Sequence, residues 1–311
     1  MEVMTDEDDV FAWLQDEVKP TVDARIQEWL EEFEYAERLW YPVATGGKRI
    51  RPGLVFLVSE IVDVPREDAL DIAAGVELLH NFTLVHDDII DGDEYRRGEP
   101  TLWAKHGEGS AINLGDMMFA KAILCFPPET RDLALDTVIT VTNGEQMDID
   151  FADRRDITVE EYMTMVRRKT GALLELCVDA PLALAETDLD LDGFTSLGPA
   201  FQIRDDLLDF QEGKGREKIG NDVRAGKRTL MVVHADDDRV YDILDKPFEE
   251  TTDEDVQEVM EILEAEGSMD FAEQQMNDLI DEARAAIAAL PDSPGREKLE
   301  ALGRFITERD V

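Results

Sequence analysis

The run LLHNFTLVHDDIID, residues 78–91, decides how this chain folds and where its chemistry lies. Apolar residues recur at spacings of three and four, as at Val76 and Leu79, which is the period of a helix with one buried face. The helix leads directly into a cluster of aspartates. Because residues i and i+4 share a helix face, Asp87 and Asp91 form a two-carboxylate pair at its end.

A second aspartate cluster follows further along, in FQIRDDLLDF, residues 201–210, where Asp205 and Asp209 repeat the spacing. Hard carboxylate oxygens suit Mg²⁺, which typically accepts one or two carboxylates together with phosphate oxygens. The chain has 39 Asp, so chance alone predicts about 0.6 such patterns, and an acidic surface cluster is the alternative for either motif by itself. Both motifs follow apolar helical runs, which favours metal sites.

Helical spacing recurs along nearly the whole chain, and strand-like alternation is rare. We therefore expect an all-α fold in one domain covering residues 1–311. The predicted helices cover residues 6–18, 21–39, 53–62, 66–91, 111–125, 129–152, 158–185, 191–211 and 226–235, with three more after residue 253. Helix breaks are predicted at Pro20, Pro65, Pro181 and Pro291. Thr158 and Glu161 predict a capping box.

Three loops, residues 42–52, 92–110 and 212–228, concentrate glycine and basic residues in an otherwise acidic chain. The first contains GGKRIRP and the second contains YRRGEPT. Arginine donates in a fork-shaped, bidentate manner to phosphate oxygens, and glycine lets the backbone approach an anion closely. Phosphate binding is therefore predicted in these loops. Simple ion pairs with nearby carboxylates, or an ordinary loop at a helix start, are the alternatives.

The chain carries 73 Asp and Glu against 31 Lys and Arg, a formal net charge of −42. Such a charge argues against nucleic-acid binding, because a phosphate backbone would be repelled. The acidity is spread over segments with regular apolar spacing, so we interpret it as a solvated surface rather than a disordered tail. Our hypothesis is a halophilic source with very high internal salt, since at ~1 M salt the Debye length shrinks to about 3 Å.

The sequence also predicts a cellular location. The start, MEVMTDEDD, is acidic where a secretory signal would be basic and apolar, and no run approaches 18 uncharged apolar residues. Cys125 and Cys177 lie in apolar helical stretches and are expected to be buried, reduced thiols. We therefore predict a cytoplasmic protein without a transmembrane segment.

Six motifs in one order carry a family resemblance. They are GGKRIRP, LLHNFTLVHDDIIDGDEYRRGEPT, GEQMDIDF, RRKTGALLE, FQIRDDLLDF and IGNDVRAGKRTL, and they cover residues 46–230. Together they resemble the trans polyprenyl diphosphate synthase family. The resemblance implies an isoprenoid synthase helical bundle around a central cavity, usually a homodimer, which elongates an allylic diphosphate with isopentenyl diphosphate using magnesium. One departure is Leu102 and Trp103, where a histidine-bearing stretch is expected.

The resemblance also implies roles for individual residues. Asp87 and Asp91 resemble ligands of two magnesium ions and Asp205 with Asp209 those of a third, while Asp88 and Asp206 resemble weaker or indirect partners. The isopentenyl diphosphate site is implied at Lys48, Arg51, His80 and Arg97. The allylic diphosphate site is implied at Arg96, Lys169, Thr170, Gln202, Lys218 and Lys227. Lys169, Thr170 and Gln202 are further expected to act in catalysis, as dipoles near the developing cation.

Product length is expected to depend on how deep an apolar pocket runs beneath the first aspartate motif. Phe82 lies about one and a half helical turns before Asp87, and the resemblance suggests that its bulk closes the pocket beside the small Thr83. The predicted product is the twenty-carbon geranylgeranyl diphosphate. Two alternatives remain, a non-catalytic partner subunit and a terpene cyclase on the same fold. The complete motifs count against the first, and the basic residues Lys48 and Arg51 count against the second.

If the acidic surface is adapted to concentrated salt, removing salt will destabilise the folded chain by exposing its self-repulsion. We expect helical structure to be lost between about 1 M and about 0.1 M KCl, where the Debye length grows from about 3 to about 10 Å. Circular dichroism during stepwise dilution measures this loss. A constant helical signal down to the lowest salt would contradict the hypothesis.

Overall fold

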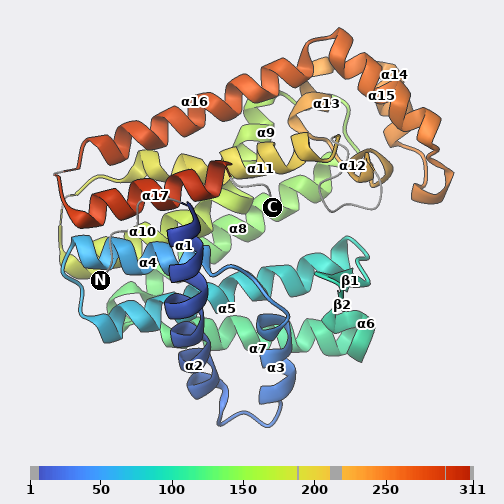
Figure 1. Ribbon diagram of the computed structural model, residues 1–311. Helices are drawn as coiled ribbons and strands as arrows, with labels where there is room; N and C mark the ends of the chain where they lie inside the picture. Colours follow the sequence, from blue (N-terminus) through green and yellow to red (C-terminus); the bar gives the residue numbers. More distant parts are fainter. Residues whose placement is uncertain (1–6, 188, 211–218, 291, 309–311) are drawn as a thin grey trace. The chain divides into compact units, whose positions relative to one another are not determined.

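The computed structural model of the chain describes residues 7–187, 189–210, 219–290 and 292–308. Within these ranges the regular structure is helical apart from one short hairpin, which confirms the predicted all-α class (Figure 1). The chain divides into two compact units. Unit one comprises Met1–Val138, Leu173–Asp190 and Leu290–Phe305, and unit two comprises Ile139–Ala172, Leu191–Ala289 and Ile306–Val311. That the whole chain folds as one domain stays a prediction.

Unit one is built mainly from the first part of the chain. Its elements are α1 Glu7–Trp13, η1 Leu14–Val18, α2 Lys19–Leu30, α3 Ala36–Ala44, α4 Ile50–Ile61, α5 Arg66–Ile90, β1 Tyr95–Arg96, β2 Glu99–Pro100, α6 Leu102–His106, α7 Glu108–Cys125 and η2 Pro128–Thr130. The two strands form an antiparallel hairpin that pairs Tyr95 with Pro100 and Arg96 with Glu99. Helix α5 packs along α7, and it also contacts α4 and α2 (Figure 1).

Unit two contains most of the later elements. They are α9 Val159–Val166, η3 Arg167–Gly171, η4 Asp192–Ser196, α11 Leu197–Leu208, α12 Asn221–Arg224, α13 Leu230–Ala235, α14 Asp238–Leu244, η5 Phe248–Glu250, α15 Asp253–Ala265 and α16 Ser268–Ala288. The long helix α16 packs against both α11 and α13 (Figure 1). Three helices have residues in both units, namely α8 Arg131–Phe151, α10 Ala172–Ala185 and α17 Pro294–Glu308.

The predicted helix breaks at Pro20 and Pro181 are wrong, whereas the break at Pro65 is confirmed. Pro65 immediately precedes α5, but Pro20 stands in the first turn of α2, and Pro181 lies inside α10. The π-helical turn η1 ends at Val18, two residues before Pro20, and its wider turn relieves the clash between a proline ring and the preceding carbonyls. The chain leaves the helix instead at residues 31–35. Pro291 lies outside the described residues.

Most of the longer predicted helices are confirmed to within a few residues. The range 66–91 corresponds to α5, 129–152 to α8, and 158–185 to the continuous run of α9, η3 and α10, while three helices follow residue 253. The capping box of Thr158 and Glu161 is also present. The sequence did not predict α6, α12 or α14, because four to seven residues offer too few periods to detect. No helix of the described ranges is long and apolar enough to cross a membrane.

Two glycines let the backbones of unit two approach closely. A Cβ at Gly144 of α8 would stand 2.3 Å from the backbone nitrogen of Lys169, and a Cβ at Gly198 of α11 would stand 2.9 Å from the Cα of Gly171. Any larger residue would push α8 or α11 away from η3. The two glycines therefore set the positions of the η3 side chains relative to both helices.

Replacing Gly144 with alanine should destabilise unit two, because the new methyl group meets rigid backbone. We expect Gly144→Ala to lower the free energy of unfolding by about 1–3 kcal/mol, measured by urea titration at constant high salt. Gly109→Ala in α7 is the matched control, since a Cβ there would find nothing within 4 Å. That control should gain up to about 1 kcal/mol from alanine's helix propensity. Equal stability of the two variants would refute the close approach.

Candidate active site

The first aspartate motif lies at the carboxyl end of α5 in unit one. Asp87 is half-buried, and Asp91 is exposed directly after the last helical residue, with its backbone N–H donating to the Asp87 carbonyl at 2.8 Å. Between them Asp88 is buried, and its Oδ1 accepts a hydrogen bond from Arg96 Nε at 2.5 Å. Burial raises the pKa of Asp88, and Arg96 opposes that shift. Asp88 is therefore engaged by Arg96. Asp87 and Asp91 lie one helical turn apart, on either side of this pairing.

The hairpin after α5 places Arg97 against the glycine loop, residues 46–49. Arg97 has a φ of 55°, and its side chain covers Gly46 and Gly47 so closely that a Cβ on Gly47 would come within 3.3 Å of Arg97 Nη1. Arg97 is exposed to solvent, yet its pKa is lowered, first by desolvation and then by neighbouring guanidiniums that include Arg96. The Arg97 side chain thus lies directly against the backbone of Gly46 and Gly47.

The start of α6 fixes this hairpin. Thr101 Oγ1 and Trp103 Nε1 both donate to the Asp93 carbonyl, at 2.9 and 2.8 Å. Trp103 stands where the family pattern predicted a histidine-bearing stretch. Its indole therefore holds the segment that carries both arginines in place.

Arg49 ends the glycine loop, and its side chain is 0% exposed. The guanidinium donates to Asp23 Oδ1 at 2.8 Å, to Glu77 Oε1 at 3.0 Å, and to the carbonyls of Gly46 and Val43 at 2.8 and 2.9 Å. Two carboxylates compensate its charge. Arg49 therefore ties the glycine loop to α2 and α5.

Arg51 and His80 lie near this ion pair, and burial affects the pKa of both side chains. Among the residues that the structure describes, Arg51 Nε is buried without a hydrogen-bond partner. Burial lowers the pKa of Arg51, and Cys177 and Glu77 partly offset the shift. Burial, followed by the charges of Arg51 and Arg97, lowers the pKa of His80 well below its usual value. His80 is consequently a neutral imidazole at pH 7.

Lys48 completes a group of cationic and imidazole side chains, Lys48, Arg51, His80 and Arg97, which we call the basic cluster. Lys48 is half-buried, and its ammonium lies 5.6 Å from the centre of the Phe305 ring. The charges of Arg51 and Arg97 both act on His80, and the buried Glu77 partly compensates the two arginines. The cluster is therefore suited to a multiply charged anion.

Lys169 occupies the π-helical turn η3 of unit two. Its Nζ contacts Glu145 Oε2 at 2.8 Å and Asp148 Oδ2 at 2.5 Å, both on α8. Burial by itself would lower the pKa of Lys169, but Asp148 and Glu145 outweigh burial and raise the pKa. The two carboxylates thus keep this half-buried amine charged.

A chain of hydrogen bonds joins η3 to the second aspartate motif. Thr170 Oγ1 lies 3.4 Å from Gln202 Oε1, and Gln202 Nε2 donates to Asp206 Oδ1 at 2.9 Å. Tyr162 Oη donates to the other carboxylate oxygen of Asp206 at 2.8 Å. Burial raises the pKa of Asp206, Asp222 adds to the shift, and the bonds from Gln202 and Tyr162 oppose it. Asp206 is thus held by two neutral donors.

The other members of the second motif differ in exposure. Asp205 is half-buried, whereas Asp209 is buried, and Asp209 Oδ2 accepts the backbone N–H of Asp222 at 2.9 Å. Asp222 Oδ1 in turn lies 3.7 Å from Lys227 Nζ. Asp209 therefore organises the segment that leads to Lys227. Lys218 lies outside the described residues.

Phe82 and Thr83 lie on the same helix as the first aspartate motif. The Phe82 ring is buried, with its centre 4.9 Å from the His86 ring and 5.4 Å from the Phe119 ring of α7. Thr83 Oγ1 donates to the His80 carbonyl at 2.8 Å. Phe82 is thus part of an aromatic group that fills the space between α5 and α7.

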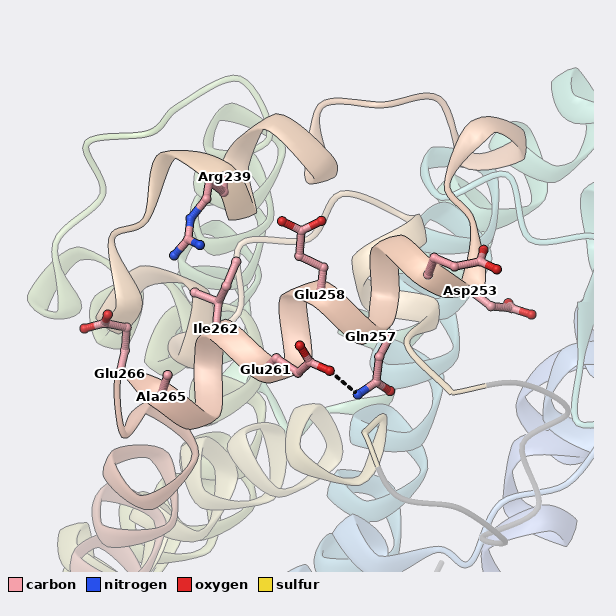
Figure 2. A pocket seen from close by; sticks show the side chains of 9 residues that line it. Arg239, Asp253, Gln257, Glu258, Glu261, Ile262, Ala265 and Glu266 are labelled. Atoms are coloured by element: carbon pink, nitrogen blue, oxygen red, sulfur yellow. Dashed lines mark hydrogen bonds between the residues drawn. The ribbon is translucent and has the colours of Figure 1, made fainter.

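The predicted site residues divide between the two units. Unit one carries Lys48, Arg51, His80, Phe82, Thr83, Asp87, Asp88, Asp91, Arg96 and Arg97, and unit two carries Lys169, Thr170, Gln202, Asp205, Asp206, Asp209 and Lys227. A hollow of about 700 Å³ on α15 contains none of them. Figure 2 shows that carboxylates such as Glu258, Glu261 and Glu266 surround this hollow, with Arg239 at one side. Such a lining would repel a diphosphate.

Comparison with known proteins agrees with this arrangement of motifs. The family model described as polyprenyl synthetase matches residues 32–265, a span that contains both aspartate motifs and the basic cluster. The chain belongs to the polyprenyl synthetase family. It is accordingly a prenyltransferase.

Individual relatives are similar over most of their length. A short chain isoprenyl diphosphate synthase of Methanothermobacter thermautotrophicus is 36% identical over 86% of this chain and 88% of its own. A geranylfarnesyl diphosphate synthase of Natronomonas pharaonis is 33% identical over 88% of this chain and 90% of its own. The crystal structure of a geranylgeranyl pyrophosphate synthetase from Pyrococcus horikoshii has a TM-score of 0.85 and 35% identity, and covers 97% of this chain and 99% of its own.

Enzymes of this family are generally magnesium-dependent, and the first aspartate motif fits that ion. Asp87 and Asp91 offer hard oxygen ligands one turn apart at the end of α5, while Asp88 is bonded to Arg96. In the second motif Asp206 and Asp209 are hydrogen-bonded, and Asp205 is half-buried. No group of three or more His, Cys, Asp or Glu among the described residues could hold a metal ion. Magnesium bound by one or two carboxylates and phosphate oxygens does not require such a group.

The sequence patterns did not identify several residues that hold the side chains of the aspartate and basic motifs. Glu145 and Asp148 hold Lys169, Tyr162 holds Asp206, and Glu77 holds Arg49. A signal existed for Glu145 and Asp148, because they stand three residues apart in the quoted motif GEQMDIDF and so share a helix face. Tyr162 and Glu77 gave no comparable signal.

Removing the Tyr162 hydroxyl should destabilise the fold, because a buried oxygen of Asp206 loses its donor. We expect Tyr162→Phe to lower the free energy of unfolding by about 1–3 kcal/mol, measured by urea titration at high salt. Tyr35→Phe is the control, since Tyr35 is 43% exposed and water can replace any partner of its hydroxyl. Similar small losses in the two variants would argue against a structural role for the Tyr162 bond.

Proposed function

We propose that this chain condenses isopentenyl diphosphate with an allylic diphosphate in a magnesium-dependent reaction, with geranylgeranyl diphosphate as the product. The observation that carries the proposal is the basic cluster of unit one. Its cations are gathered within a strongly acidic protein, beside the first aspartate motif, and the buried Arg51 Nε has no acceptor among the described residues. A diphosphate supplies the missing acceptors and the compensating charge.

The basic cluster is assigned to isopentenyl diphosphate. Arg51 and Arg97 can each donate two bonds to phosphate oxygens, and Lys48 adds a point charge. His80 is neutral because of burial and the surrounding guanidiniums, so it donates a hydrogen bond without adding a further charge. Isopentenyl diphosphate does not ionise in the reaction, and strong fixed charges that merely hold it are therefore suitable.

The allylic diphosphate is assigned to Arg96, Lys169, Thr170, Gln202 and Lys227, together with Lys218. Lys169 stays protonated because Glu145 and Asp148 raise its pKa, so it can stabilise negative charge on the leaving group. Thr170 and Gln202 carry neutral dipoles in the same hydrogen-bonded chain. These dipoles can stabilise the positive charge that develops on the allylic carbon.

Asp87 and Asp91 are the proposed ligands of two magnesium ions, and Asp205 is the proposed ligand of a third, with Asp209 close by in sequence. Magnesium, when bound, neutralises charge on the diphosphate and makes it a better leaving group. Asp88 and Asp206 have indirect roles in this proposal, because Arg96 and the pair Tyr162 and Gln202 occupy their oxygens.

The chemical step breaks the allylic carbon–oxygen bond, and the electron pair leaves with the diphosphate. The double bond of isopentenyl diphosphate then attacks the allylic carbon, and a proton is lost to form the new double bond. The departing diphosphate is the proposed base. Apolar walls exclude water from the cation, so burial of residues such as Phe82 serves the chemistry as well as the core.

A homodimer in the cytoplasm at high salt completes the proposal. Helix α8 exposes Leu135, Ile139 and Ile149, with exposed fractions of 38%, 58% and 41%. Thr142 and Gln146 are also exposed, and the five residues follow the spacing of four and three that is typical of a helix-pairing seam. This stripe supports pairing with a second copy.

Neither alternative is favoured by the relatives, which are named synthases. Incubating the purified protein at high salt with Mg²⁺, labelled isopentenyl diphosphate and each allylic primer in turn tests the assignment. We expect an elongated product whose formation stops when EDTA removes the metal. Asp87→Asn should lower the rate about 10²- to 10³-fold.

Asp63→Asn is the control for that substitution, because Asp63 is an exposed turn residue with a φ of 58°, a conformation that asparagine tolerates. Its rate should equal that of the unmodified enzyme. Absence of product with every primer at high salt would instead support a non-catalytic partner subunit.

Replacing Phe82 with alanine tests the proposed limit on chain length. Removing this ring opens space between α5 and α7, so we expect Phe82→Ala to form products longer than twenty carbons, measured by chromatography of the dephosphorylated alcohols. Phe248→Ala is the control, since Phe248 is 55% exposed and lies in unit two. An unchanged product distribution in a folded Phe82→Ala enzyme would remove Phe82 from this role.

A further inference from the structure

Arg228 is a buried guanidinium at which three segments of unit two meet. Its side chain is 2% exposed, although it directly follows Lys227 in the sequence. The guanidinium donates to the carbonyls of Ala152, Arg154 and Gly226 at 2.8, 3.2 and 3.0 Å, and to Asp245 Oδ1 at 2.6 Å. Because each nitrogen has an acceptor, both the position and the plane of the side chain are fixed.

Two of the three segments that meet at Arg228 lead to the proposed allylic diphosphate site. Ala152 directly follows α8, the helix whose Glu145 and Asp148 hold Lys169. On the other side Arg228 is adjacent to Lys227 in the chain. The Arg228 side chain thus connects the segment that contains Lys227 with α8, the helix whose carboxylates hold Lys169.

Lys227 is fixed from its other side by the second aspartate motif. Its backbone N–H donates to the Asp222 carbonyl at 2.9 Å, and the Asp222 N–H donates to Asp209 Oδ2 at 2.9 Å. Loss of Arg228 would remove the bonds that join this segment to the residues after α8, and the segment could then move relative to α8. The proposed reaction tolerates little such movement, since small displacements of charged groups weaken their effect on a leaving group.

Asp245 divides its two carboxylate oxygens between two arginines. Oδ1 accepts from the buried Arg228, and Oδ2 accepts from Arg155, whose side chain is 42% exposed. Both guanidiniums lie over the Tyr241 ring, at 5.4 Å for Arg228 and 5.9 Å for Arg155. The two arginines therefore share their acceptor and their aromatic neighbour. Within the described part of the chain, Arg155 bonds to Asp242 and Asp245 and makes no hydrogen bond to the segment of Lys227.

We propose that Arg228, oriented by Asp245, is a positioning residue that sets the spacing between Lys227 and Lys169 for binding of the allylic diphosphate. The inference rests on the proposed function, since it takes both lysines as ligands of that substrate. Arg228 does not touch the substrate. It acts through the backbone on either side of the site.

Steady-state kinetics of Arg228→Gln, Arg228→Lys, Asp245→Asn and Arg155→Gln test this role at high salt. The readouts are kcat and the separate KM values for the allylic and isopentenyl diphosphates, because KM does not change when a fraction of the protein is unfolded. We expect Arg228→Gln to raise the allylic KM roughly 10- to 100-fold, with the isopentenyl KM within about twofold. Arg228→Lys should recover only part of this loss, because an ammonium cannot replace a planar fork.

Asp245→Asn keeps the shape of the acceptor and removes its charge, so it should raise the allylic KM about tenfold through weaker orientation of Arg228. Arg155→Gln is the matched control and should leave both KM values within about twofold. A purely structural role for Arg228 predicts a lower thermal midpoint with both KM values unchanged, or both raised equally, and either result would overturn the inference.

Lys227→Gln separates this inference from the proposed function. If Lys227→Gln leaves the allylic KM unchanged, the assignment of Lys227 to the allylic diphosphate fails, and the inference fails with it. If Lys227→Gln raises the allylic KM while the Arg228 and Asp245 variants do not, the assignment of Lys227 stands and only the positioning role of Arg228 is lost.

Discussion

The constraint on which this protein depends is that a buried positive charge needs compensating carboxylates. Arg49 shows how unit one meets this constraint. Its buried guanidinium is compensated by Asp23 and Glu77, and it binds the carbonyls of the glycine loop as well. Because this arginine is neutralised internally, the loop keeps its shape without a ligand. The neighbouring cations Arg51 and Arg97 lie within the electrostatic influence of the same Glu77, which partly compensates them.

Unit two meets the same constraint with carboxylates placed beside a lysine. Burial would favour the neutral amine of Lys169, but Glu145 and Asp148 hold it in the charged form. The close approach at Gly144 makes these contacts possible, since it brings the α8 backbone to η3. A polar network of Thr170, Gln202 and Asp206 continues from the same turn. Charge retention and helix packing are therefore parts of one arrangement.

Irregular helical turns occur both at predicted site residues and beside a proline. Lys169 and Thr170 lie in the π-helical turn η3, inside an otherwise continuous run of helix from α9 to α10. A π turn inserts an extra residue and redirects side chains, and such turns are frequent at functional sites. The other π turn, η1, accommodates Pro20 and keeps α1 and α2 continuous. In both places a local widening of the helix replaces a break in the chain.

The motifs were largely predictable from sequence, because they depend on residues that are close along the chain. The helical period identified α5 and α8, and the spacing of Asp87 and Asp91 placed both on one helix face. The order of the six motifs indicated the family, which the match over residues 32–265 establishes. The expected breaks at Pro20 and Pro181 failed, because proline is tolerated where a neighbouring turn or the surrounding packing relieves its clash.

What the sequence by itself determined is therefore the all-helical class, the family and the identity of the acidic and basic motifs. Only the tertiary structure decided which members of each motif are already engaged, such as Asp88 with Arg96, Asp206 with Tyr162, and Arg49 with Glu77. These choices depend on contacts between residues that packing brings together from distant parts of the chain. A local pattern records which side chains a helix carries, but burial and the nearest partner determine their charge and their role.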